Sequence, residues 1–148
     1  DMAGKKLQGS PSFYVGSTVM AGGTGQAEVM KERKARGVRY FVTQPIFDLA
    51  ALRPLLSSTG VDRRRLLIKV LLLKSAGMAR YLALHGGEVQ IAQSLVERLQ
   101  AARDVAGECA AIAAELVSAA KAEELGGVLI NCLGWEARLP EILGRRKE

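Results

Sequence analysis

Cysteine and histidine are scarce in this sequence, which holds only Cys109, Cys132 and His85. The two cysteines are far apart and lack CxxC spacing, and a single histidine cannot complete a familiar zinc pattern with them. So few cysteines also exclude a disulfide scaffold. We therefore expect two buried thiols in a cytoplasmic protein, no metal site, and a histidine that lies at the surface or at a helix end.

Long uninterrupted apolar stretches are also missing. The longest runs, Leu66–Leu73 and Val105–Ala120, are too short or too interrupted by charge to cross a bilayer, so we expect no membrane span. The chain opens with Asp1 and a polar, glycine-rich stretch that has no secretory signal. Because position 1 is not methionine, we interpret the chain as a cut piece or a processed product.

Aromatic residues are few: three Phe, three Tyr and one Trp among 148 residues. The 21 Lys and Arg exceed the 15 Asp and Glu and give a net charge of +6. A basic protein attracts anions, but the basic residues are scattered, and the clusters Arg63–Arg65 and Arg145–Lys147 fall in an expected loop and tail. With no interleaved aromatics to stack on bases, we expect no nucleic-acid partner.

Strand-like and helix-like segments alternate along the chain. The expected strands are Phe13–Val19, Tyr40–Ile46, Leu66–Leu73 and Val128–Leu133, and each precedes a helix. Such βα repetition predicts a parallel sheet covered by helices, and the nearly continuous apolar run of the third strand predicts burial on both of its faces. The first three strands start at regular intervals, and a longer gap that holds one extra helix precedes the fourth. This spacing favours quarter-turns of a (β/α)₈ barrel over a dinucleotide-binding fold. A whole barrel needs about 250 residues, so we expect residues 1–148 to form half of one.

Capping residues and glycines set the expected helix limits. Thr24 is the expected N-cap of a helix that runs to Arg36 and stops at Gly37. Asp48 and Asp104 are further expected caps, and Pro54 should bend or shorten the helix that follows Asp48. One further helix is expected to start at Ser75 and to end near Gly86-Gly87. The remaining expected helices are Leu49–Ser58, Ile91–Ala102, one from Val105 that ends at Gly126, and Leu139–Leu143.

The segment Ala21–Gly25 follows a strand and precedes a helix, where backbone amides can hold an anion. It matches neither the P-loop nor GxGxxG. We therefore keep two interpretations open, a weak phosphate site and an ordinary βα turn.

Two motifs stand out in the sequence. The second strand reads YFVTQPIFD over residues 40–48, and the stretch after the third strand reads KSAGMAR over residues 74–80. Both resemble segments of the methylenetetrahydrofolate reductase family, and KSAGMAR is similar to the subgroup also found fused to homocysteine methyltransferases. Segments 9–16, 31–38 and 127–130 resemble the same family in the same order. The resemblance covers strands five to eight of that barrel.

The resemblance implies a flavin-dependent oxidoreductase of one-carbon metabolism. Members of the family pass a hydride from a nicotinamide donor, NAD(P)H, to FAD and then to 5,10-methylenetetrahydrofolate, giving 5-methyltetrahydrofolate. The flavin carries the redox chemistry, and the protein positions the substrates. The family's acid and much of its FAD site lie in the other half of the barrel. We therefore expect an oligomer, or a partner that supplies this N-terminal half.

The resemblance also implies site residues. Gln44 matches the glutamine that binds the pterin, and its amide can both donate and accept hydrogen bonds. Lys74, Ser75 and Ala76 match the loop that borders the folate. For the cofactor, Arg33 and Lys31 match basic helix positions that face FAD, and Met20 follows the fifth strand near the flavin. Asp48 is interpreted as a cap, and Thr43 and Phe47 as structural. The expected site residues are Gln44, Lys74, Ser75, Ala76, Arg33, Lys31 and Met20.

The chain also departs from the family pattern, at Met20, Lys69 and Leu129. These departures keep a second hypothesis open: a non-catalytic remnant that binds folate or a partner subunit. A third hypothesis is a different half-barrel that binds phosphate at Ala21–Gly25.

Overall fold

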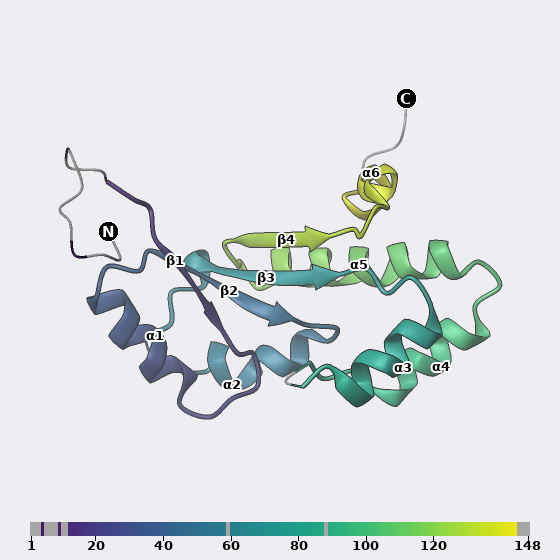
Figure 1. Ribbon diagram of the computed structural model, residues 1–148, viewed down its shortest axis with the longest axis horizontal. Coiled ribbons are helices and arrows are strands. Elements are labelled where there is room, and N and C mark those ends of the chain that lie inside the picture. Colours follow the sequence, from purple (N-terminus) through teal and green to yellow (C-terminus); the bar gives the residue numbers. More distant parts are fainter. Residues whose placement is uncertain (1–3, 5–8, 10–11, 59, 88, 145–148) are drawn as a thin grey trace.

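The computed structural model describes residues 4, 9, 12–58, 60–87 and 89–144, and these form an α/β fold (Figure 1). The basic cluster Arg145–Lys147 lies outside the described residues, as do Ser10 and Pro11 of segment 9–16, which resembles the reductase family. The strands are β1 (Gly16–Val19), β2 (Tyr40–Pro45), β3 (Leu66–Leu71) and β4 (Gly127–Asn131). The α-helices are α1 (Gln26–Ala35), α2 (Arg53–Leu56), α3 (Ala76–His85), α4 (Gln93–Ala101), α5 (Val105–Ala122) and α6 (Leu139–Ile142). Short 3₁₀ turns are η1 (Leu49–Leu52), η2 (Arg63–Arg65) and η3 (Glu136–Arg138).

The strands form one parallel sheet in the order β1-β2-β3-β4. Each strand therefore pairs with its neighbour in sequence, whereas a doubly wound sheet reverses its strand order partway. The predicted parallel α/β architecture is confirmed. Its sequential order is compatible with half of a barrel.

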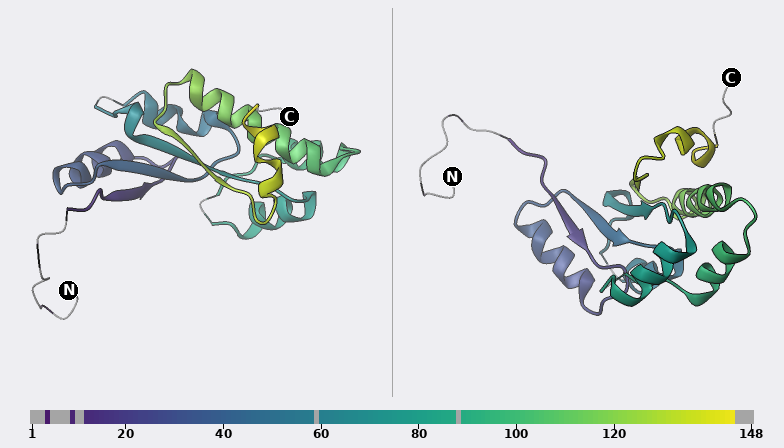
Figure 2. Two further views of the ribbon diagram at one scale, coloured as in Figure 1. Left: turned by 90° about the horizontal axis from the view of Figure 1, so that it is seen from above. Right: turned by 45° about the vertical axis from the view of Figure 1, so that its right-hand side comes forward.

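The helices cover one face of this sheet. On β3, Leu66, Ile68 and Val70 are 0–1% exposed and face the helices, whereas Leu67, Lys69 and Leu71 are only half-buried on the opposite face. Helix α5 runs along β3 and β4, as Figures 1 and 2 show, and α1 packs against β1. The predicted burial of the third strand on both faces is therefore wrong for this chain, because the βα connections bring every contacting helix to the same side.

The uncovered side of the sheet is called the open face here. Paired residues of neighbouring strands share a face, so the register assigns to it Thr18 and Val42, then Lys69 and Leu129, among others. Leu129 is 42% exposed. At the start of the strands the Tyr40 ring lies over Gly16 and stacks on Tyr14 with centroids 5.7 Å apart. A Cβ at position 16 would lie within 2.2 Å of that ring, so the stack needs a glycine there.

A register shift interrupts the pairing of β2 with β3. Val42 is opposite Leu67, but Pro45 is opposite Lys69, so β2 carries one extra residue. The buried Thr43 hydroxyl accepts a hydrogen bond from the Lys69 backbone N–H at 3.0 Å. Thr43 is thus structural, as predicted, because its side chain replaces the missing backbone acceptor.

Two of the three predicted caps, Asp48 and Asp104, are confirmed, and Ser75 precedes a helix as predicted. The side chains of Asp48, Ser75 and Asp104 accept backbone N–H groups at the starts of η1, α3 and α5. The prediction for Thr24 is wrong. Helix α1 begins one residue later with Gly25 as its N-cap, whose φ of 75° favours glycine. Gly37, with φ 100°, follows the end of α1 as predicted.

Several boundaries differ from the predicted ones. The first strand begins at Gly16 rather than Phe13, and the third ends at Leu71 rather than Leu73. The expected helix Leu49–Ser58 is divided into η1 and α2, with Pro54 in the first turn of α2, where a proline needs no N–H partner. Helix α4 begins at Gln93, and Ile91 lies in the linker before it.

An ion-pair network joins α4 to α5. Arg98 of α4 bonds both Glu108 and Glu115 of α5, at 2.7–2.8 Å for the two contacts with Glu115. This contact lowers the pKa of the Glu115 carboxyl, so its stabilisation is present at neutral pH and is lost as the pH falls through that lowered pKa. Because the pair is partly exposed, we expect a contribution below about 1 kcal/mol.

Thr43→Val should lower the free energy of unfolding by about 1–2 kcal/mol, because it leaves the Lys69 N–H without its acceptor while keeping the side-chain shape. Urea unfolding followed by circular dichroism measures the loss. Thr18→Val makes the same change at an exposed position and is the matched control. Equal unfolding midpoints for the two variants would contradict this account of the register shift.

Candidate functional site

A pocket of about 490 Å³ lies at the edge of the sheet where the parallel strands end. Its walls come from three segments: the β1–α1 turn, the end of β2 with the residues after it, and the α3–α4 linker. Parallel strands end at one edge, so the loops after them meet there although they are distant in sequence. The lining residues are 20–23, 44–48, 51, 87 and 90–92.

Gln44 is half-buried in this pocket and lies within the register shift of β2, between Val42 and Pro45. Within the described part of the chain, no group hydrogen-bonds its side-chain amide. One wall beside it is apolar, because Ile46 and Phe47 are both buried core residues. An amide that both donates and accepts hydrogen bonds can bind the edge of a flat heterocycle, and the apolar wall beside it can contact the face of the ring.

Met20 lines the same pocket from the β1–α1 turn. Its backbone N–H donates to the Gln26 side-chain oxygen at 3.1 Å, so the first residue of α1 fixes the turn. Two of the expected site residues, Gln44 and Met20, are therefore brought together by the fold.

The pocket can bind but carries little acid–base chemistry. Asp48 is the only ionisable side chain among the lining residues of the described chain, and its Oδ1 accepts the Ala50 N–H at 2.8 Å as the cap of η1. A reaction in this pocket that needs a general acid would therefore need one from outside the described lining.

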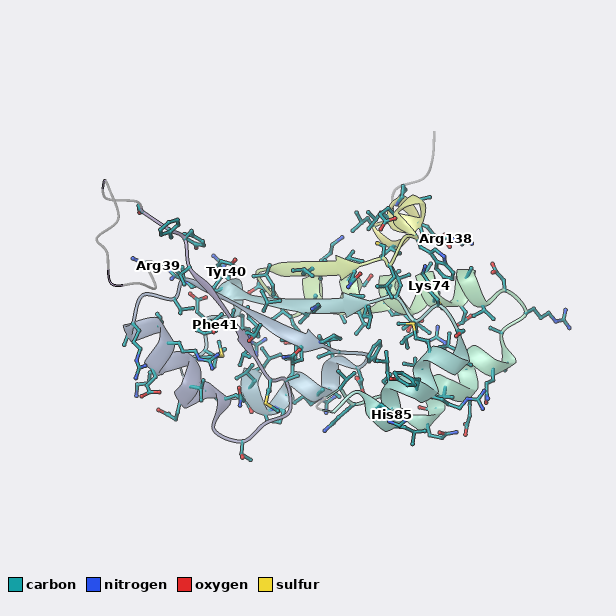
Figure 3. All side chains as sticks on the ribbon, in the orientation of Figure 1. Arg39, Tyr40, Phe41, Lys74, His85 and Arg138 are labelled. Carbon is teal, nitrogen blue, oxygen red and sulfur yellow. The ribbon has the colours of Figure 1, made fainter. Side chains whose placement is uncertain are left out.

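Lys74, Ser75 and Ala76 lie at the same edge of the sheet but do not line the 490 Å³ pocket. The Lys74 ammonium lies 5.2 Å from the ring centroid of Trp135, in the connection after β4. The Ser75 hydroxyl accepts the Met78 N–H at 3.0 Å as the cap of α3, and Ala76 begins that helix. Figure 3 shows Lys74 between the end of β3 and the α6 side of the molecule.

Arg33 and Lys31 are placed away from Gln44. Arg33 donates to the Ser17 hydroxyl at 2.8 Å and to the Thr18 carbonyl, so it ties α1 to β1. Lys31 is exposed and pairs with Glu28 at 4.0 Å. Neither side chain lines the pocket with Gln44 and Met20.

The lining of the Gln44 pocket can be compared with what FAD would need. The pocket's volume falls in the range of small-molecule sites, but its described lining includes no cation for the dinucleotide's two phosphates. The described lining therefore offers an amide and apolar groups to a ring and no cationic side chain to the phosphates of FAD.

Some residues at this edge of the sheet were not predicted from the sequence as site residues. Gln90 and Ile91 line the pocket from the α3–α4 linker, which was predicted only as a helix end and a helix start. Trp135 contacts Lys74. Its status as the single tryptophan, following a glycine after the last strand, was the one signal available.

The other sequence candidates have structural places. Cys109 and Cys132 are both buried and unpaired, as predicted, and the Cys109 thiol donates to the Leu73 carbonyl. His85 is the exposed last residue of α3 and lies beside Tyr81, also as predicted. Among the residues that the structure describes, no group of acidic, Cys and His side chains could hold a metal, and no helix is long and apolar enough to cross a membrane.

Comparison of the sequence with protein-family models finds no match, and a search of curated proteins finds none either.

We expect a thiol reagent such as DTNB to react with native Cys109 and Cys132 at least about tenfold more slowly than with the unfolded chain. Burial is the main cause that raises the pKa of both thiols. The native rate should therefore keep rising with pH beyond about 8.5, where an exposed thiol is already half ionised. Equal native and unfolded rates near neutral pH would contradict this burial.

Proposed function

We propose that this chain forms the carboxyl-terminal half of a barrel of the methylenetetrahydrofolate reductase type. The observation that carries the proposal is the Gln44 amide, half-buried in a pocket at the carboxyl edge of a sequentially ordered parallel sheet. Active sites of (β/α)₈ enzymes lie at this edge. The activity is reduction of 5,10-methylenetetrahydrofolate to 5-methyltetrahydrofolate by the complete barrel, with FAD as cofactor and NAD(P)H as donor.

The pocket supports binding of the pterin ring. The Gln44 amide can donate to a ring nitrogen or carbonyl and accept from an amino group, while Ile46 and Phe47 support the ring's face. Lys74, at the same edge, supplies a positive charge for the glutamyl carboxylates of folate. In this proposal the described residues bind and orient the substrate.

The open face argues for a second half. It leaves apolar residues such as Val42 and Leu129 uncovered, and strands β1 and β4 each pair on one side only. Unpaired edges favour association. Lys69 projects from the middle of this face, and no carboxylate of the described strands lies on it. A second copy would bring another lysine, so the charges favour a covering half of different sequence that carries an acidic residue.

Completion is tested by mixing the chain with the N-terminal half-barrel of a characterised methylenetetrahydrofolate reductase. We expect a one-to-one complex by sedimentation and a bound flavin spectrum, because the partner supplies the acid and the missing cations. NAD(P)H oxidation that depends on methylenetetrahydrofolate is the activity readout. A stable monomer that neither pairs with the added half nor acquires flavin would overturn the completion idea.

Gln44→Ala should weaken binding of 5-methyltetrahydrofolate about tenfold, because it removes hydrogen bonds to a partly desolvated ring. Calorimetric titration measures the dissociation constant. Gln93→Ala is the matched control, since Gln93 is exposed on α4 and bonds only Glu97 among the described residues. Equal affinities for the two variants would place folate elsewhere.

A second function, a non-catalytic subunit that binds folate or a partner, is favoured by one observation. Arg33 already bonds β1, and Lys31 is away from the pocket, so neither serves the phosphates of FAD there. The departures at Met20, Lys69 and Leu129 point the same way. In the completion experiment this alternative gives a complex and folate binding without flavin.

A further inference from the structure

A second pocket, of about 480 Å³, lies at the opposite edge of the sheet, where the strands begin. It is formed by one side of α1, the start of β2 and the segment before β3, and is called the basic pocket below. It shares no residue with the Gln44 pocket. Figure 3 shows Arg39 and Phe41 on this side of the molecule, near α1. Its lining residues are Ala27, Glu28, Met30, Lys31, Lys34, Val38, Arg39, Phe41, Gly60, Val61, Asp62 and Arg65.

The interior of the basic pocket is apolar. Met30 and Phe41 are core residues only 5% and 3% exposed, and Ala27, Val38 and Val61 pack partly buried around them. An ordinary solvated helix face has no such walls. The volume falls in the range of small-molecule sites, about 300–1,000 Å³.

The charges around this interior do not balance. Of the four cations, Arg65 is paired with Asp62 at 3.2 Å and Lys31 with Glu28 at 4.0 Å. The Arg65 side chain also donates to the Arg39 backbone carbonyl at 3.4 Å, which links the segment before β3 to the start of β2. Within the described part of the chain, Lys34 and Arg39 have no carboxylate partner, so the pocket has two cations in excess of its two acids.

We infer that the basic pocket binds a small amphiphilic anion: an apolar body that contacts Met30 and Phe41, with one or two carboxylate, sulfonate or phosphate groups held by Lys34 and Arg39. Apolar walls with a few convergent charges are the general composition of ligand sites. Charge-assisted hydrogen bonds from an arginine favour a carboxylate or a phosphate. The site is independent of the proposed folate pocket, since the two lie at opposite edges of the sheet.

The probe is 8-anilinonaphthalene-1-sulfonate, titrated by fluorescence against the folded chain. The double variant Lys34→Glu/Arg39→Glu should weaken its binding about tenfold or more, because both attractive charges are reversed. Arg80→Glu/Arg103→Glu is the control, since it makes the same change in net charge at exposed positions outside the pocket. The control should bind like the original chain.

A second variant tests the apolar interior. Ala27→Phe adds a ring at the half-buried wall of α1 and should block the probe, while circular dichroism checks that the fold is kept. Inorganic sulfate alone should compete only weakly, because it has no apolar body. Unchanged affinity in both the charge and the filling variants would place the probe elsewhere, for example on the open face, and would overturn the inference. Competition by sulfate as strong as by the probe itself would also overturn it.

Discussion

The structure depends on one constraint: the helices that contact the parallel strands pack on a single face of the sheet. Because the strands are parallel, each connection leads the chain back to the edge of the sheet where the next strand begins. The helices in these connections that contact the strands pack on one side of the sheet. That side buries Leu66, Ile68 and Val70 almost completely, and α5 packs along β3 and β4 there. The other side is left open, so the fold presents an apolar face with a lysine in its middle.

The pockets at the two edges of the sheet differ in the side chains that line them. At the carboxyl edge, loops meet around an amide and apolar walls, with Asp48 as the only ionisable lining residue described. At the amino edge, four basic side chains surround an apolar interior that holds Met30 and Phe41. Two cations in excess of the acids thus lie in the pocket at the edge opposite the proposed substrate site. Lys31, expected near a flavin, lies at this amino edge.

Local hydrogen bonds then decide the fine placement of the site. The extra residue in β2 is tolerated because Thr43 replaces a backbone acceptor for Lys69. Gln44 follows directly and enters the pocket with its amide free of partners in the described chain. Arg33 and Ser75, in contrast, are engaged within the fold, one between α1 and β1 and the other as a cap. The residue type therefore indicated which side chains can form hydrogen bonds. Their position in the fold decided whether those hydrogen-bonding groups are free for a ligand.

The sequence by itself determined the element types, their order and the caps Asp48 and Asp104, because these depend on local periodicity and on the local side chains. It also determined that Gln44 ends a strand. It did not determine that Lys31 lies at the amino edge, that Gln90 and Ile91 meet Gln44, or that β3 is covered on one side only. Those facts depend on contacts between segments far apart in the chain, and local patterns carry no information about which distant surface is present. Only the tertiary structure therefore decided which residues share a pocket and which face is left open.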